Sequence, residues 1–275
     1  MISNYHTHCC FCDGSGQPEE YVLQALKKDF STLGFSSHGP IPFTEWTMRN
    51  EDTGNYLETI DYLKSKYTNL IQIYKGMEID YLSGDTSTIF KRYDLDYIIG
   101  AVHLINDGIH REYFSIDGNI TEFQKTFEIC SNSSIKKLVS RYYETVLEML
   151  QNNRIDILAH LDLVKKNNTN QKYFNETDAW YVNLVKDVVR KISSYNVIVE
   201  VNTGGIARGY TDNVYPSLWI IKEMKKWNIP IVLSSDAHKP ENLDFYFDQA
   251  KEDIKSAGYD EVWDLNNGKW ENRKL

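Results

Sequence analysis

Histidine and carboxylate side chains recur in this sequence at spacings that suit metal binding. Two pairs stand two residues apart, His6 with His8 and Asp236 with His238. Residues i and i+2 of a β-strand project to the same face, so each pair can offer two ligands to one centre. Imidazole nitrogen and carboxylate oxygen suit zinc, iron or manganese. The pattern predicts a metal-dependent hydrolase.

Short β-rich runs alternate with helix-like stretches along the chain. We expect strands at residues 2–7, 32–36, 71–77, 95–102, 156–159, 197–201 and 231–234. We expect helices at residues 18–29, 55–67, 135–152, 178–194, 217–227 and 241–257. This alternation is typical of an α/β fold with a parallel sheet. We predict a distorted (β/α)7 TIM-like barrel, a single domain over residues 1–275, with an open doubly wound sheet as the alternative.

Six of the seven histidines stand at or just after the carboxyl end of an expected strand. The candidate metal ligands are His6, His8, Asp13, His38, Glu78, His103, His160, Asp236 and His238. A lone histidine is usually a hydrogen-bonded structural residue. The carboxyl ends of barrel strands converge on one mouth, however, so these residues together favour a shared site. Asp13 is less distinctive, because Asp-Gly is also a turn signal.

Two long segments, 105–134 and 165–177, interrupt the alternation and are interpreted as loops on the same face, the first with a small hairpin at 111–116. Arg208 follows the sixth expected strand in a glycine-rich stretch. Its guanidinium could hold a phosphate in bidentate fashion, whereas an ordinary surface arginine is the alternative. Arg111 and Lys165 are weaker phosphate candidates, and His110 in the hairpin is interpreted as structural.

Composition narrows the class of partner. The net charge is −9, the opposite of the basic field that nucleic-acid binders usually show. Neither a signal peptide nor an apolar run of membrane-spanning length is visible. Three of the four cysteines, Cys9, Cys10 and Cys12, crowd together and are interpreted as packing residues rather than as a disulfide framework or ligands. We expect a cytoplasmic protein with a small-molecule substrate, and the oligomeric state stays open.

These residues resemble the PHP (polymerase and histidinol phosphatase) family, and its histidinol-phosphatase branch in particular. The resemblance rests on His6-Thr7-His8 and on segments 11–14, 34–38, 74–78, 96–103, 159–162, 206–210, 215–217 and 234–238. It implies a barrel that holds three divalent metal ions. His6, His8, Glu78 and Asp236 would bind the first metal, and Glu78, His103 and His160 the second. Asp13, His38 and His238 would bind the third, although some relatives carry a histidine where Asp13 stands.

The resemblance also implies hydrolysis of a phosphate monoester, L-histidinol phosphate, in histidine biosynthesis. Arg208 would hold the phosphate, and Glu78, Asp236 and His238 would be catalytic. The metals would activate water, and the leaving alkoxide would take its proton from a metal-bound water, His238 or Asp236. The alternatives are a phosphoesterase of the same fold with another monoester or nucleotide substrate and, less in keeping with Asp236-Ala237-His238, an amidohydrolase-type enzyme.

Overall fold

Seven parallel strands form the main sheet of the protein, whose computed structural model describes residues 2–84, 93–106, 108 and 112–275. The strand order is β1-β2-β3-β4-β7-β8-β9. The bounds are β1 (Ile2–Asn4), β2 (Phe30–Phe35), β3 (Gln72–Asp80), β4 (Tyr97–Ala101), β7 (Ile157–Leu158), β8 (Ile198–Asn202) and β9 (Ile231–Ser234). All seven strands were expected, but two end at clearly different residues: β1 stops at Asn4, so that His6 and His8 follow the strand, and β3 extends to Asp80, so that Glu78 lies within the strand.

The two outer strands of this order, β1 and β9, meet just beyond their carboxyl ends. Thr7 forms a parallel bridge with Ala237. The amide of His8 donates to the Ala237 carbonyl at 2.8 Å, and the amide of Ala237 donates to the His6 carbonyl at 3.2 Å. The sheet is therefore a nearly closed seven-stranded barrel, which confirms the predicted architecture, and its seam is joined at the two His-containing pairs.

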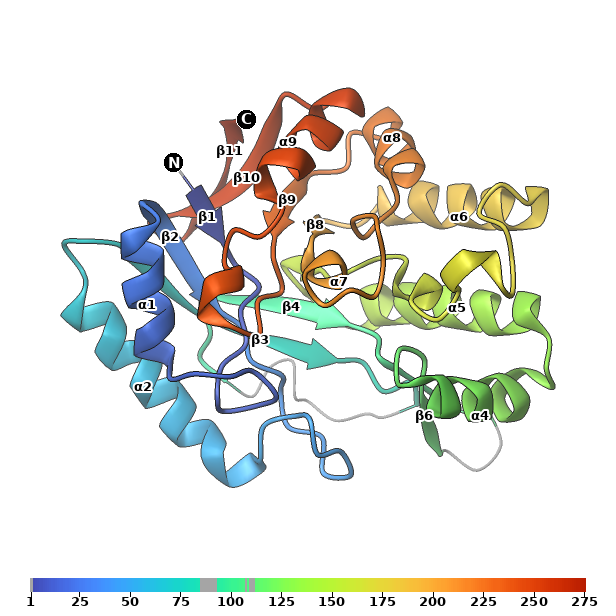
Figure 1. Ribbon diagram of the computed structural model, residues 1–275, viewed down its shortest axis with the longest axis horizontal. Helices are drawn as coiled ribbons and strands as arrows, with labels where there is room; N and C mark the ends of the chain where they lie inside the picture. Colours follow the sequence, from blue (N-terminus) through green and yellow to red (C-terminus); the bar gives the residue numbers. More distant parts are fainter. Residues whose placement is uncertain (1, 85–92, 107, 109–111) are drawn as a thin grey trace.

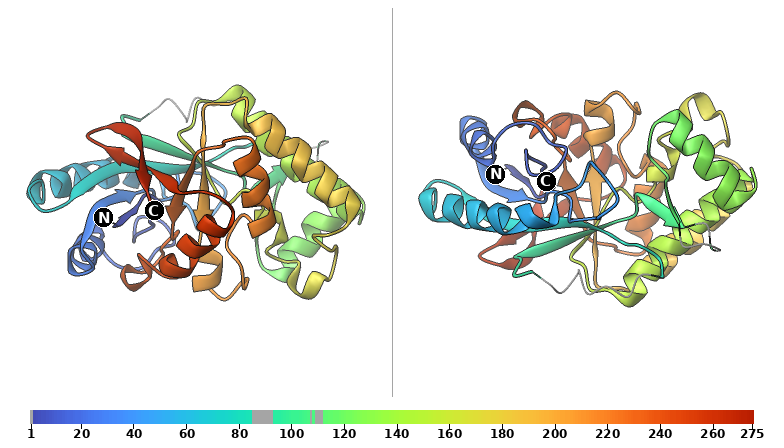
Figure 2. Two further views of the ribbon diagram at one scale, coloured as in Figure 1. Left: turned by 90° about the horizontal axis from the view of Figure 1, so that it is seen from above. Right: turned by 90° about the horizontal axis from the view of Figure 1, so that it is seen from below.

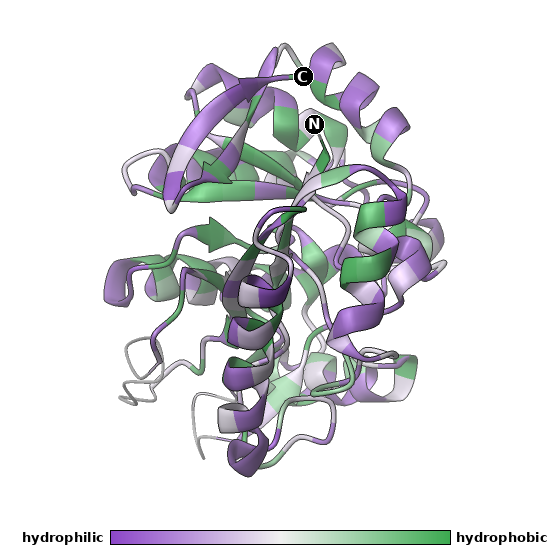
Figure 3. Ribbon diagram, turned by 90° about the vertical axis from the view of Figure 1, so that its left-hand side faces the viewer, coloured by the Kyte–Doolittle hydropathy of each residue, from purple (hydrophilic) through white to green (hydrophobic). Residues whose placement is uncertain are grey.

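Helices cover the outside of the barrel (Figure 1). The covering helices are α1 (Pro18–Lys27), α2 (Thr53–Lys66), α4 (Ile120–Ser131), α5 (Ile135–Asn152), α6 (Ala179–Ile192), α8 (Leu218–Lys226) and α9 (Phe247–Ser256). The short α7 (Gly204–Ala207) follows the carboxyl end of β8, and the 3-10 turns are η1 (Asn50–Asp52), η2 (Leu163–Lys165), η3 (Thr169–Gln171) and η4 (Pro240–Asn242). Helices α1 and α2 lie on one flank and α5 and α6 on the other, as the views from above and below also show (Figure 2). The barrel strands are mostly apolar, whereas the helices carry both polar and apolar residues (Figure 3), as expected for a parallel sheet that helices cover. None of the helices in the described ranges is long and apolar enough to cross a membrane.

Segment 105–134 is more ordered than the sequence suggested. Strand β5 (Leu104–Asn106) pairs antiparallel with β6 (Tyr113–Ser115), so the expected hairpin is wider than 111–116, although its residues 107 and 109–111 lie outside the described residues. Helix α4 follows, where a loop was expected. Asn119 caps it by accepting from the amides of Thr121 and Glu122, while Glu122 accepts from the Asn119 amide at 2.7 Å. This capping box is a helix signal that the sequence contains.

A second hairpin, which was not expected, closes the amino end of the barrel. Strands β10 (Glu261–Asn266) and β11 (Lys269–Lys274) are joined by Asn267 and Gly268, which both have positive φ, as a two-residue type I′ turn requires. The Leu265 amide donates to the hydroxyl of Tyr5 at 2.7 Å, and the Trp270 ring packs on Tyr5 at 5.1 Å. The expected helix 241–257 is in fact η4 followed by the shorter α9.

Candidate metal centre

The carboxylate of Glu78 lies at the middle of a group of histidines at the barrel mouth. Glu78 is fully buried on β3. Five histidine nitrogens lie within 3.8 Å of its oxygens: His6 Nε2 (3.1 Å), His8 Nε2 (3.3 Å), His38 Nδ1 (2.9 Å), His103 Nε2 (3.8 Å) and His160 Nε2 (3.1 Å). These histidines follow β1, β2, β4 and β7, so the convergence expected of barrel strand ends brings them together.

The second pair, Asp236 and His238, completes the group from the far side of the seam. Asp236 Oδ1 lies 3.2 Å from His8 Nε2 and 3.6 Å from His6 Nε2. Asp236 has a φ of 48°, a left-handed conformation that is costly for most residues other than glycine and better tolerated by aspartate. Its neighbour Gly204 allows the close approach, because a Cβ there would lie 2.8 Å from the Asp236 Cβ.

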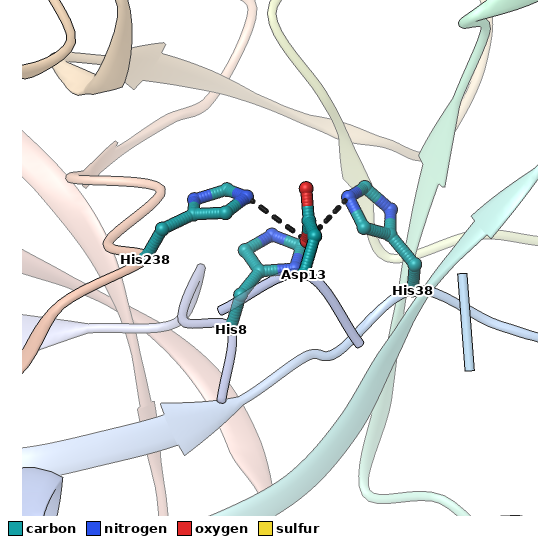
Figure 4. Close-up of side chains that lie close together, drawn as sticks. All are labelled: His8, Asp13, His38 and His238. Atoms are coloured by element: carbon teal, nitrogen blue, oxygen red, sulfur yellow. Dashed lines mark ion pairs between the residues drawn. The ribbon is translucent and has the colours of Figure 1, made fainter. Parts of the chain in front are cut away.

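Asp13 joins the group although its loop gave the weakest sequence signal. Its Oδ1 lies 3.3 Å from His238 Nε2 and 3.7 Å from His38 Nε2 (Figure 4). The His8 ring stacks on that of His238 with centroids 4.2 Å apart and lies 4.3 Å from that of His38. All nine candidate ligands are therefore brought to one mouth.

The donor atoms fit divalent cations in chemistry and in spacing. Four overlapping groups have ligand atoms within 4.8 Å of one another: His8, Asp13, His38 and His238; His6, His8 and Asp236; His38, Asp80 and His103; and Glu78, His103 and His160. Within the described residues, several of these buried atoms accept or donate no hydrogen bond, namely His6 Nε2, His8 Nε2, His38 Nδ1 and Glu78 Oε2. Buried polar atoms need a partner, and a cation among them would supply one.

Two further carboxylates orient the histidines from behind, and sequence reasoning missed both. Glu200 Oε2 lies 2.8 Å from His6 Nδ1, and its Oε1 accepts from the His160 amide at 2.8 Å. Asp80 Oδ1 lies 2.8 Å from His103 Nδ1. When Nδ1 donates to such a carboxylate, Nε2 is left unprotonated toward the centre, which is the form that binds a metal. The sequence did contain a signal for Glu200, which is a charged residue inside the otherwise apolar run 197–201.

Burial and charge oppose each other at the centre. Burial lowers the pKa of His6, but Glu200, Glu78 and Asp236 outweigh it and raise that pKa well above its ordinary value. Burial likewise disfavours the charged form of His103, yet Asp80 and Glu78 raise its pKa to about 10. The pKa of His8 falls well below its ordinary value through burial and through the neighbouring His238 and His38. The pKa of Glu78 is well below its usual range because the histidines overcome the effect of burial.

Arg208 lies at this centre, as the sequence predicted. Its Nη2 donates to Asp236 Oδ2 at 2.7 Å, and its Nη1 lies 2.6 Å from His238 Nδ1. Its Nε is buried with no hydrogen-bond partner among the described residues. Arg208 therefore contacts two candidate ligands and has one buried donor without a partner among the described residues.

The other cationic candidates differ from Arg208. Lys165 is buried, and its Nζ donates to Ser217 Oγ at 2.5 Å and pairs with Asp162 at 2.8 Å, so it fixes the loop rather than facing the centre. Lys166, which was not singled out, pairs with Asp117 at 3.0 Å. Arg111 and His110 lie outside the described residues.

Two cysteines, Cys9 and Cys12, border the centre without joining the donor groups above. None of the four cysteines, all of which lie in the described ranges, forms a disulfide. Cys12 Sγ lies 3.4 Å from His8 Nδ1, and Cys9 Sγ lies 3.3 Å from Ser37 Oγ. These contacts agree with packing residues behind the site.

Comparisons with known proteins agree on one family. The PHP domain description matches residues 4–204. The chain is 27% identical to "Probable histidinol-phosphatase" of Deinococcus radiodurans, covering 94% of both chains, and 27% identical to "Histidinol-phosphatase" of Bacillus subtilis, covering 88% of this chain and 96% of that one. The fold is similar to that of a protein from Listeria monocytogenes, with a TM-score of 0.79, 19% identity, and 90% and 99% of the two chains covered.

The fold is also similar to that of a histidinol phosphate phosphatase from Lactococcus lactis, solved with zinc, L-histidinol and phosphate. The TM-score is 0.73 at 22% identity, with 98% of both chains covered. The family description spans most of the strands that carry the histidine cluster. Taken with a seven-stranded barrel whose mouth gathers these histidines and carboxylates, it identifies the chain as a member of the PHP family.

Proposed function

We propose that this chain is a metal-dependent phosphatase that hydrolyses L-histidinol phosphate to L-histidinol and phosphate. The observation that carries the proposal is the buried Glu78 carboxylate among five histidine nitrogens, with the unpartnered Arg208 Nε close by. The names of the curated relatives, and the L-histidinol and phosphate bound by the Lactococcus lactis enzyme, support this choice of substrate.

We further propose three divalent cations, zinc, iron or manganese. His6, His8, Glu78 and Asp236 would hold the first, Glu78, His103 and His160 the second, and Asp13, His38 and His238 the third, with His8 near enough to the last group to share. Such cations lower the pKa of water and neutralise phosphoryl oxygens.

The protein's own groups would position the phosphoryl group. The Arg208 guanidinium is planar and permanently charged, so it suits a phosphate oxygen. A phosphoryl group on its Nε would lie next to Asp236 and His238, which Arg208 already contacts. We therefore propose Asp236 and His238 as catalytic residues. Glu78 is the third proposed catalytic residue, because its carboxylate lies among the histidines at the middle of the centre. Glu200 and Asp80 would hold a proton on the Nδ1 atoms of His6 and His103.

The pathway, the cellular compartment and the class of substrate are part of the same proposal. One phosphatase domain over residues 1–275 would act in histidine biosynthesis. Four cysteines without a disulfide among the described residues suit a reducing compartment, so we propose the cytoplasm. A net charge of −9 favours a small-molecule substrate over a nucleic acid.

The test is phosphate release from L-histidinol phosphate by the purified enzyme, with and without a chelator. A panel of sugar phosphates, nucleotides and p-nitrophenyl phosphate sets the specificity. Fast, chelator-sensitive release that strongly favours L-histidinol phosphate is expected. Release that favours another ester would keep the site and reject the substrate, and no release from any ester despite bound metal would reject the phosphatase.

A further inference from the structure

The barrel mouth has a cationic side and an aromatic side. Arg208, at the end of α7, contacts Asp236 and His238 after β9. Across the centre, the indole of Trp46 makes T-shaped contacts with the rings of His38 and His103, which follow β2 and β4. In Figure 1 the pale-blue segment after β2 lies well apart from the orange segment around α7. The candidate ligands therefore lie between a guanidinium and an indole.

The Trp46 ring touches the centre without being buried in it. Its centroid lies 4.7 Å from that of His38, at an interplanar angle of 84°, and 5.4 Å from that of His103, at 70°. The residue as a whole is only half-buried. Both contacts are T-shaped, so neither histidine ring lies parallel to the indole as a stacked partner.

The segment that carries Trp46 is held in place by its own hydrogen bonds. The Met48 amide donates to the His38 carbonyl at 3.2 Å, and the Met48 side chain is buried. The Ile41 amide donates to Thr47 Oγ1 at 3.2 Å, and the hydroxyls of Thr44 and Thr47 are 2.7 Å apart. Trp46 is thus presented by a fixed loop.

We propose that Trp46 is a specificity-determining residue that binds the organic part of the substrate by stacking. The class of substrate it favours is a phosphomonoester whose alcohol carries an aromatic heterocycle, above all a cationic one. This inference rests on the proposed phosphatase function and adds the residue that selects the ester.

The physical reason is the arrangement of the two sides. A phosphoryl group held by Arg208 directs the rest of the ester across the centre, toward Trp46. Indole has the strongest attraction for cations among the aromatic side chains, and it also stacks on neutral rings. An ester with a short aliphatic alcohol gains nothing from this contact, so Trp46 would separate the two kinds of substrate.

The experiment compares wild type with Trp46→Ala and Trp46→Phe on two substrates. L-Histidinol phosphate carries an imidazole and an ammonium group, whereas phosphoethanolamine carries an ammonium group and no ring. Trp227→Ala, which removes a tryptophan 43% exposed at the end of α8, is the matched control. Bound metal is counted for each protein, and product inhibition by L-histidinol gives a second readout.

Trp46→Ala is expected to raise KM for L-histidinol phosphate about tenfold and to weaken inhibition by L-histidinol by a similar factor. KM for phosphoethanolamine, the metal content and the Trp227→Ala enzyme should stay within about twofold of wild type, and Trp46→Phe should be intermediate. Equal losses on both substrates, or loss of metal, would overturn the inference, because Trp46 would then only support His38 and His103. Wild-type enzyme that does not hydrolyse L-histidinol phosphate would instead overturn the proposed function and this inference with it.

Discussion

A neutral imidazole can face a cation with only one of its two nitrogens, so each candidate ligand needs something to fix which one. For His6 and His103 that partner is a carboxylate, Glu200 or Asp80, each 2.8 Å from Nδ1. The ligands themselves could be predicted because they stand at strand ends. That rule did not find Glu200, which lies within β8, or Asp80, which ends β3, because the expected third strand stopped at residue 77.

Replacing Glu78 by glutamine should remove the charge that several histidines share. We expect the Glu78→Gln protein to lose most of its bound metal and at least about a thousandfold in kcat/KM, since the metals supply several kcal/mol of charge stabilisation. Metal analysis and the phosphate-release assay measure both effects, and circular dichroism checks the fold. A variant with full metal content and full activity would contradict the central role of Glu78.

Replacing Glu200 by glutamine should act more mildly, because no proposed ligand is removed. The amide would no longer hold the proton on His6 Nδ1 as firmly, and the metal affinity should fall about 10–100-fold. Competition with a chelator measures the affinity. Asp187→Asn, which alters a carboxylate paired with Arg190 and Lys191 on the surface of α6, is the control and should bind metal like wild type.

At the scale of elements, the strands could be predicted because their apolar sequence matches the buried position that each has in the barrel. The barrel strands are short apolar runs bounded by turns, and all seven were expected. Helix α4 and the β10–β11 hairpin were missed, although the Asn119 capping box and the Asn267-Gly268 turn are local signals. Both elements have many exposed positions, so their apolar periodicity is weak and only the turn chemistry marks them.

The first turn of α7 lies so close to Asp236 that a methyl group at Gly204 should disturb the site. A Cβ there would meet the Asp236 Cβ at 2.8 Å and the Ser235 carbonyl oxygen at 2.9 Å. We expect Gly204→Ala to lose about 1–3 kcal/mol of unfolding free energy through overpacking, and to lose activity. Chemical denaturation and the phosphatase assay measure these changes.

Gly54 provides the matched control for this substitution. It lies in the first turn of α2, and a Cβ there would meet nothing within 4 Å. Gly54→Ala should leave activity unchanged. Its free energy of unfolding should equal that of wild type within about 0.5 kcal/mol, or be slightly higher because alanine restricts the unfolded chain. Equal behaviour of the two alanine variants would contradict the tight packing inferred at Gly204.

At the scale of the whole molecule, metal binding should be coupled to protons. The pKa of His103 is raised to about 10, because Asp80 and Glu78 outweigh the effect of burial, so the protein alone keeps a proton there at neutral pH. A cation that takes His103 Nε2 must displace a proton, so affinity should rise with pH between about 6 and 9. Titrations with zinc at several pH values, together with proton release in weak buffer, test this. Affinity that is flat or falls over this range would contradict it.

The seam of the barrel has a consequence for unfolding. The first and last barrel strands are joined by backbone hydrogen bonds just beyond their carboxyl ends, at Thr7 and Ala237, in the same two motifs that supply His6, His8, Asp236 and His238. A cation shared by these motifs would act as a cross-link between the two ends of the chain. A cross-link that closes a long loop removes more conformational entropy from the unfolded chain than one that closes a short loop. A metal ion bound to both motifs would act in this way, as a disulfide does. Opening of the barrel and escape of the ion would then be one event, visible as joint loss of hydrogen-exchange protection at the amides of His8 and Ala237.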